Sequence, residues 1–119
     1  GDGGNEGGGG NKPNPNEVFG ALNVEVQPSF PGGMKKFGEY IINNFSADVD
    51  DAQYKVTLQF IVEPDGALSN IKVANSSGDT SIDNEAIRVL KSLKTKWSPG
   101  KMGEIAVRTQ FQQTIVIGN

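Results

Sequence analysis

Side chains able to carry out covalent or metal chemistry are scarce in this chain. The sequence contains no Cys and no His, which excludes disulfides, thiolate and imidazole metal ligands, thiol nucleophiles and Ser-His catalysis. Ser98, Lys96 and Glu85 are the remaining candidates for a hydrolytic site, but no spacing joins a nucleophile to a base and to a group that orients it. The sequence therefore predicts a protein that is not an enzyme and has no catalytic residues and no cofactor.

Two further groups of residues resemble ligand sites at first sight. Asp48, Asp50 and Asp51 lie close together in a polar connector, yet a calcium loop needs more oxygen ligands at regular spacing and a glycine at its turn. The glycine run at 7–10 lacks the preceding strand and the following Lys-Ser/Thr of a phosphate-binding loop. We therefore predict no metal site, and we interpret these segments as a solvated connector and part of a linker.

The charge of the chain is unevenly distributed. The net charge is -3 over 119 residues, but the segment 86–119 carries six basic side chains and only one acidic side chain, Glu104. A nucleic-acid partner is disfavoured because the whole chain is acidic and no aromatic residue is interleaved among exposed positions to stack on bases. An acidic or polar peptide is the partner that this cationic surface favours.

The composition divides the chain into a linker and one domain. Residues 1–17 are rich in Gly, Pro and Asn and contain almost no apolar side chain, so we predict a flexible linker there. Residues 18–119 are then a single domain of ordinary size. No apolar run approaches the ~20 residues that cross a bilayer, and because the chain opens with Gly1 we expect a processed fragment whose anchor lies upstream.

Hydrophobic periodicity predicts the elements that must position any site. Apolar residues at three- and four-residue steps indicate an amphipathic helix, and strict alternation indicates a half-buried strand. A Pro-Asp-Gly turn at 64–67 joins two of the strands into a hairpin. The expected elements are a helix at Met34–Phe45, strands at Tyr54–Glu63 and Leu68–Ala74, a helix from Thr80 to about Lys94, and a strand at Ile105–Ile117.

These elements predict an α+β fold of two layers. The right-handed crossover rule places Tyr54–Glu63 at the centre of a three-stranded antiparallel sheet, with the helices packed on one face. Trp97, the only tryptophan, is expected to fill the layer between helix and sheet. We interpret Gly66 and Gly100 as turn residues with no role beyond shape.

The last strand is expected to be a long, open edge of the sheet. Its solvated side carries Arg108, Gln110, Gln112 and Thr114, and such an edge can accept an extended peptide through its free backbone groups. Arg108 would attract an acidic or polar partner, although an ordinary solvated strand face explains the same side chains. The predicted partner-binding edge consists of Val107, Arg108, Thr109, Gln110, Phe111, Gln112 and Gln113.

Five sequence fragments, in order, resemble the C-terminal domain of the TonB energy transducers in the form common among Bacteroidetes. They lie between Val24 and Ile117 and include a Trp-x-Pro-Gly motif. The fragments are the Pro-Gly-rich segment with Pro31, Gly32 and Gly33, the strand Val56–Val62 followed by Asp65 and Gly66, the pair Glu85 and Ala86, the motif with Trp97, Pro99 and Gly100, and Val107 to Phe111.

The resemblance implies a periplasmic binding module, tethered to the inner membrane by a segment outside this chain. Such a module pairs by strand addition with the N-terminal TonB box of outer-membrane transporters, and it transmits energy from an inner-membrane, proton-driven complex for nutrient uptake. It would bind no nucleic acid and insert no part of this chain into a membrane. The alternative is a diverged TonB-like structural or interaction domain of an envelope lipoprotein, without energy transduction.

Overall fold

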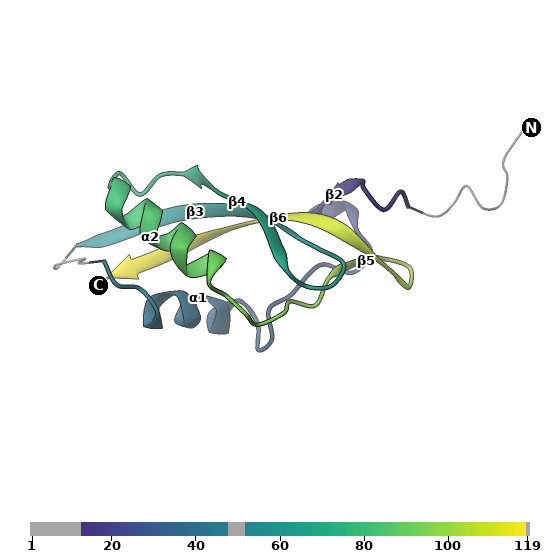
Figure 1. Ribbon diagram of the computed structural model, residues 1–119, viewed down its shortest axis with the longest axis horizontal. Coiled ribbons are helices and arrows are strands. Elements are labelled where there is room, and N and C mark those ends of the chain that lie inside the picture. Colours follow the sequence, from purple (N-terminus) through teal and green to yellow (C-terminus); the bar gives the residue numbers. More distant parts are fainter. Residues whose placement is uncertain (1–12, 48–51, 119) are drawn as a thin grey trace, which may run out of the picture.

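The computed structural model describes residues 13–47 and 52–118. It is an α+β fold in which two helices cover one face of a sheet that curls along its length (Figure 1). The linker residues 1–12 and the acidic residues Asp48, Asp50 and Asp51 lie outside the described residues. The elements in chain order are β2 (Val18–Gly20), η2 (Ala21–Asn23), α1 (Met34–Asn43), β3 (Gln53–Val62), β4 (Leu68–Asn75), α2 (Thr80–Lys91), β5 (Gly100–Met102) and β6 (Ile105–Gly118).

Strand β3 lies between β4 and β6, as the crossover argument predicts. Both neighbours run antiparallel to it, and all ten residues of β3 pair with β6, from Gln53 opposite Gly118 to Val62 opposite Thr109. The alternation of apolar and polar residues fixes this register, because a shift by one residue would turn the apolar side chains away from the helices.

The prediction of a three-stranded, fully antiparallel sheet is wrong. The sheet has five strands in the order β2-β6-β3-β4, with β5 paired to β6, and it is mixed because β2 runs parallel to β6. Strands β2 and β5 have three residues each, too few to show an alternating pattern. The pairing of β2 depends on β6, a strand that is remote in sequence, whereas β5 forms a short hairpin with the start of β6.

An aromatic cluster around Trp97 forms one end of the core. The Trp97 side chain is 3% exposed, and its ring centroid lies 4.9 Å from that of Phe37, 5.3 Å from that of Phe60 and 5.5 Å from that of Phe111, all at steep interplanar angles. Such edge-to-face contacts add to the stabilisation from burial. The prediction of Trp97 as a core residue is confirmed.

Ile105, the apolar first residue of the predicted strand Ile105–Ile117, is exposed in the structure. It lies at the start of β6, directly opposite Met102 in the short hairpin that β5 makes with β6. Further along β6, the alternation places the polar residue Thr109 at a buried position. Its hydroxyl donates to the Val107 carbonyl over 3.1 Å. This local bond satisfies a buried polar group without a partner from another element.

The two glycines interpreted as turn residues have different roles. Gly66 has φ +89 in the turn between β3 and β4, as expected, and a Cβ there would overlap the Trp97 carbonyl oxygen. Gly100 is not a turn residue, because it is the first residue of β5. A Cβ on Gly100 would overlap the Thr109 side chain, so the glycine is required for close approach of two strands.

Helix α2 begins at Thr80, as predicted, and ends at Lys91, before the predicted end near Lys94. Its cap is Asp79, whose carboxylate accepts hydrogen bonds from the backbone N–H of Ser81 over 2.8 Å and of Ile82 over 3.4 Å. Asp83, in the first turn, accepts from the Ser77 backbone N–H and hydroxyl. The cap still satisfies N–H groups that an isolated helix end leaves free.

Candidate functional site

The two edges of β6 differ in what they pair with. One edge pairs with β3 over Thr109–Gly118. On the opposite edge, Val18, Phe19 and Gly20 of β2 pair in parallel with Arg108, Thr109 and Gln110. Within residues 13–47 and 52–118, no strand pairs with this outer edge between Phe111 and Gly118. The backbone groups of that stretch are therefore free to accept a further strand.

The predicted open edge is wrong over its first part. Val107 pairs with Gly100 of β5, and Arg108 to Gln110 are covered by β2. The physical reason is that each residue has one N–H and one C=O, and those that bond to the chain's own short strands cannot bond to a partner. Phe111, Gln112 and Gln113 are the predicted residues that lie on the unpaired part.

The side chains of the unpaired part alternate between two environments. Gln113 and Ile115 lie opposite Leu58 and Val56, on the face that the helices cover. Gln112 and Thr114 lie on the other face, where the Thr114 and Thr57 hydroxyl oxygens are 2.8 Å apart. A strand added here would place alternate side chains toward the helical layer and toward solvent.

A surface hollow of about 460 Å³ opens where β2 ends and the unpaired edge begins. Its lining includes Leu22 and Gln27 on the N-terminal segment and Phe111 and Gln112 on β6. Leu22 is 88% exposed, and Phe111 also contacts the Trp97 ring. The hollow therefore connects the start of the free edge to the aromatic cluster of the core.

Arg108 does not offer a free charge to a partner. Its Nε and Nη2 atoms donate to the two carboxylate oxygens of Glu63 over 2.9 Å and 3.1 Å, and Nη1 donates to the Asn16 carbonyl over 3.2 Å. The Arg108 guanidinium holds the pKa of Glu63 below its usual range. The two-point contact with Glu63 joins β6 to the end of β3, and the bond to Asn16 adds the segment before β2. The expectation that Arg108 attracts an acidic partner is therefore corrected: Arg108 has a structural role.

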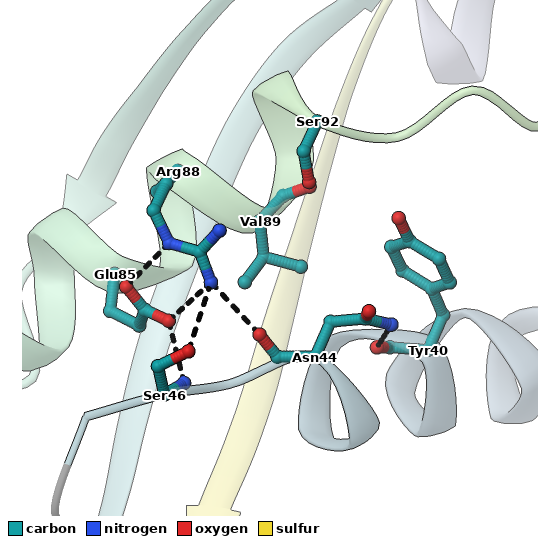
Figure 2. A network of polar contacts seen from close by, with 7 residues as sticks. All are labelled: Tyr40, Asn44, Ser46, Glu85, Arg88, Val89 and Ser92. Atoms are coloured by element: carbon teal, nitrogen blue, oxygen red, sulfur yellow. Dashed lines mark hydrogen bonds and ion pairs between the residues drawn. The ribbon is translucent and has the colours of Figure 1, made fainter.

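A second ion pair, between Glu85 and Arg88, lies within α2 and contacts the chain at the end of α1 (Figure 2). Arg88 donates to both carboxylate oxygens of Glu85, at 2.7 Å and 2.5 Å, and its Nη2 also donates to the Asn44 carbonyl over 2.9 Å. The Ser46 backbone N–H donates to Glu85 over 2.6 Å. These contacts lower the pKa of Glu85 to about 2, with Arg88 as the largest cause. The network fixes the end of α1 against α2.

The candidates for a hydrolytic site each contact a different partner. Glu85 is bound by Arg88 and Ser46, Lys96 lies 3.8 Å from the Asp65 carboxylate, and Ser98 pairs through its backbone with Ser29. None of the contacts among the described residues joins one candidate to another.

The acidic side chains do not form a metal site in the part of the chain that the structure describes. No three of them come together there as a metal site would require. None of its helices is both long enough and apolar enough to span a bilayer.

Sequence reasoning missed β2, the element that covers the edge. Its only apolar residues are Val18 and Phe19, which follow a polar segment and precede Gly20. Two apolar residues carry no period, so no sequence signal distinguishes this strand from the end of the linker.

An α+β domain with a long, partly unpaired edge strand is typical of protein-interaction modules. The family model of the Gram-negative bacterial TonB protein C-terminal matches residues 47–116, which is more than half of the chain. The chain therefore belongs to the TonB C-terminal domain family, a family of periplasmic, transport-related interaction domains. No curated protein and no solved structure matches the chain. The Bacteroidetes form stays a prediction.

Proposed function

We propose that this domain binds the N-terminal TonB box of outer-membrane transporters by strand addition to β6. The observation that carries the proposal is the outer edge from Phe111 to Gly118, which pairs with no other described strand although its opposite edge is fully bonded to β3. An extended peptide laid along this edge would use the free N–H and C=O groups for affinity. The chain supplies no equivalent free stretch between Arg108 and Gln110.

The alternation along the free edge supports an extended guest with two distinct faces. Side chains directed toward the helical layer would lie beside Gln113 and Ile115, and those directed outward would lie beside Gln112 and Val116. Lys55 is exposed opposite Val116 on the outer face, so this face favours polar or acidic side chains. The hollow beside Phe111 can take one larger side chain at the start of the guest strand.

We further propose that the domain transmits energy from an inner-membrane proton-driven complex, through a segment upstream of this chain. A pull along β6 would load its pairs with all ten residues of β3 together. The N-terminal segment enters the domain beside the same strand, because Asn16 accepts a hydrogen bond from Arg108. Force applied through the segment 1–17 would thus reach β6 close to the bound peptide.

A titration of the isotope-labelled chain with a synthetic TonB-box peptide tests the binding proposal. We expect backbone NMR shifts concentrated at Phe111–Gly118, together with a change in Trp97 fluorescence through its contact with Phe111. Shifts confined to the opposite edge, β4, or no shifts at millimolar peptide would contradict the proposal. A structural lipoprotein domain without peptide binding gives the second of these results, so the same titration separates the alternative.

Two matched proline variants locate the edge that the peptide uses. Gln112 and Gln113 are adjacent, so their N–H groups point to opposite edges of β6. Proline removes the N–H donor, so one of Gln112→Pro and Gln113→Pro should abolish peptide binding and leave the domain folded. The other should break the ladder to β3 and lower the denaturation midpoint. Retained binding in the folded variant would show that the peptide pairs elsewhere.

A further inference from the structure

Strand β2 occupies part of the edge to which the guest strand is assigned. It aligns Val18 with Arg108 and Gly20 with Gln110, in parallel, on the side of β6 away from β3. After Gly20 the chain leaves the edge through the single 3-10 turn η2. The paired stretch at 108–110 and the unpaired stretch beyond it are therefore consecutive parts of one edge (Figure 1).

The contacts that hold β2 are few compared with those of β3. The strand has three residues, Val18 is 39% exposed, and η2 contains no buried residue. The preceding residues are held by the Arg108 bond to the Asn16 carbonyl. An element with so little buried apolar surface opens locally at low cost in free energy.

The segment that follows β2 is fixed more firmly. Val26 makes a backbone bridge to Lys101, and the Glu25 carboxylate accepts from the Gly103 backbone N–H. Ser29 makes a second backbone bridge to Ser98. Release of β2 therefore leaves the chain attached from Glu25 onward, and only the part before it needs to move.

We infer that β2 is a displaceable internal strand that limits how far a guest peptide can extend along β6. This inference rests on the proposed function. A guest confined to Phe111–Gly118 can bind while β2 stays in place, whereas a guest that also pairs with Arg108–Gln110 must displace β2, because the other edge of these residues is bonded to β3 or lies at its end. For such a long guest, the apparent Kd equals the intrinsic Kd divided by the fraction of molecules in which β2 has left the edge. The paired state of β2 therefore weakens the apparent affinity.

The position of β2 also makes its displacement sensitive to a pulling force on the N-terminal segment. β2 is the first strand of the described chain, so a pull on the segment 1–17 acts on β2 before it acts on the sheet. Tension would remove β2 from Arg108–Gln110 and leave three more residues of the edge available to the guest. Pulling would in this way lengthen the pairing with the partner.

The test compares the wild-type chain with a Val18→Gly, Phe19→Gly double variant, which replaces two strand-forming residues by glycine and so weakens β2. The control is Val26→Ala, which shortens an exposed side chain in the firmly fixed segment after β2 and leaves its backbone bridge to Lys101 in place. Each protein is titrated with a synthetic TonB-box peptide long enough to pair with the whole stretch Arg108–Gly118, and backbone amides are followed by NMR. We expect the double variant to bind about threefold tighter or more than wild type, with added shifts at Arg108–Gln110, and the control to bind like wild type.

Hydrogen exchange of the wild-type chain gives a second readout. We expect the Val18–Gly20 amides to exchange faster than those of β3, and faster still with peptide bound. Equal affinities, together with β2 amides that stay protected in the complex, would overturn the inference and leave the proposed function standing. Absence of binding by all three proteins would overturn both.

Discussion

The two halves of β6 share the alternation of buried and exposed residues but differ in their surroundings. In the first half, Ile105–Gln110, strands β5 and β2 pair with the backbone, Thr109 is buried, and Arg108 is held by Glu63. In the second half, 111–118, β3 is the only strand of the described residues that pairs with β6. The difference arises largely from β2, a segment that is remote in sequence, and it decides where a partner strand has free backbone groups.

The largest effect is expected from removing Trp97, the centre of the aromatic cluster, which contacts Phe111 at the start of the free half. Trp97→Ala should destabilise the fold by about 3 to 5 kcal/mol, since a large, fully buried side chain is lost from a cluster that cannot collapse around the cavity. Denaturant unfolding followed by circular dichroism measures this change. An unchanged midpoint would show that the cluster does not support the sheet.

A smaller loss is expected from Gly66→Ala, in the turn that contacts Trp97. The φ of +89 is unfavourable for any other residue, and the added Cβ overlaps the Trp97 carbonyl oxygen. We expect a loss of about 2 to 3 kcal/mol. Gly78→Ala is a matched control, because Gly78 also has positive φ but its Cβ would meet no atom. The difference between the two midpoints isolates the steric overlap.

Arg108→Gln should weaken the pairing of β2 with the first half of β6, Ile105–Gln110, and leave the second half unchanged. The substitution removes the ion pair with Glu63 and weakens the hold on the segment before β2. We expect faster hydrogen exchange at Val18–Gly20 and no change at Ile115–Gly118, with a smaller drop in the denaturation midpoint than Gly66→Ala gives. Uniform acceleration along both halves would show that the ion pair supports the whole sheet.

The Glu85–Arg88 ion pair within α2 predicts a dependence of stability on pH. The folded-state pKa of Glu85 is about 2, below its ordinary value of 4.5. Its stabilising contribution is therefore fully present above about pH 4.5 and is lost as the pH falls toward 2. Glu85→Gln should flatten this part of the stability profile and lower the midpoint at neutral pH. An unchanged acid profile would contradict the assigned contact with Arg88.

The smallest effect is expected on the outer face of the free half. Val116 is 41% exposed, and Val116→Thr keeps the branched shape, so the stability should change by less than about 0.5 kcal/mol. Binding of the TonB-box peptide should change little as well, because strand addition depends mainly on backbone groups. A large loss of stability would show that this face is covered in solution.

The sequence by itself determined the long elements and the central position of β3. Period-2 and period-3.6 patterns span ten or more residues in β3, β6 and α1, and each carries enough apolar side chains to specify which face is buried. Trp97 as a core residue and the Gly66 turn followed from residue type alone. The family fragments also lay in the sequence, and the family match over residues 47–116 bears out the family that they indicate.

Only the tertiary structure decided which part of β6 is free. The pairing of β2 with β6 and the ion pair of Arg108 with Glu63 join residues far apart in the chain, and the close approach of Gly100 to Thr109 depends on the register of the β5–β6 hairpin. Each depends on one or a few residues, so no periodic signal precedes it. Local patterns determine which face of a strand is buried, but the occupant of an edge depends on which segment the folded chain brings beside it.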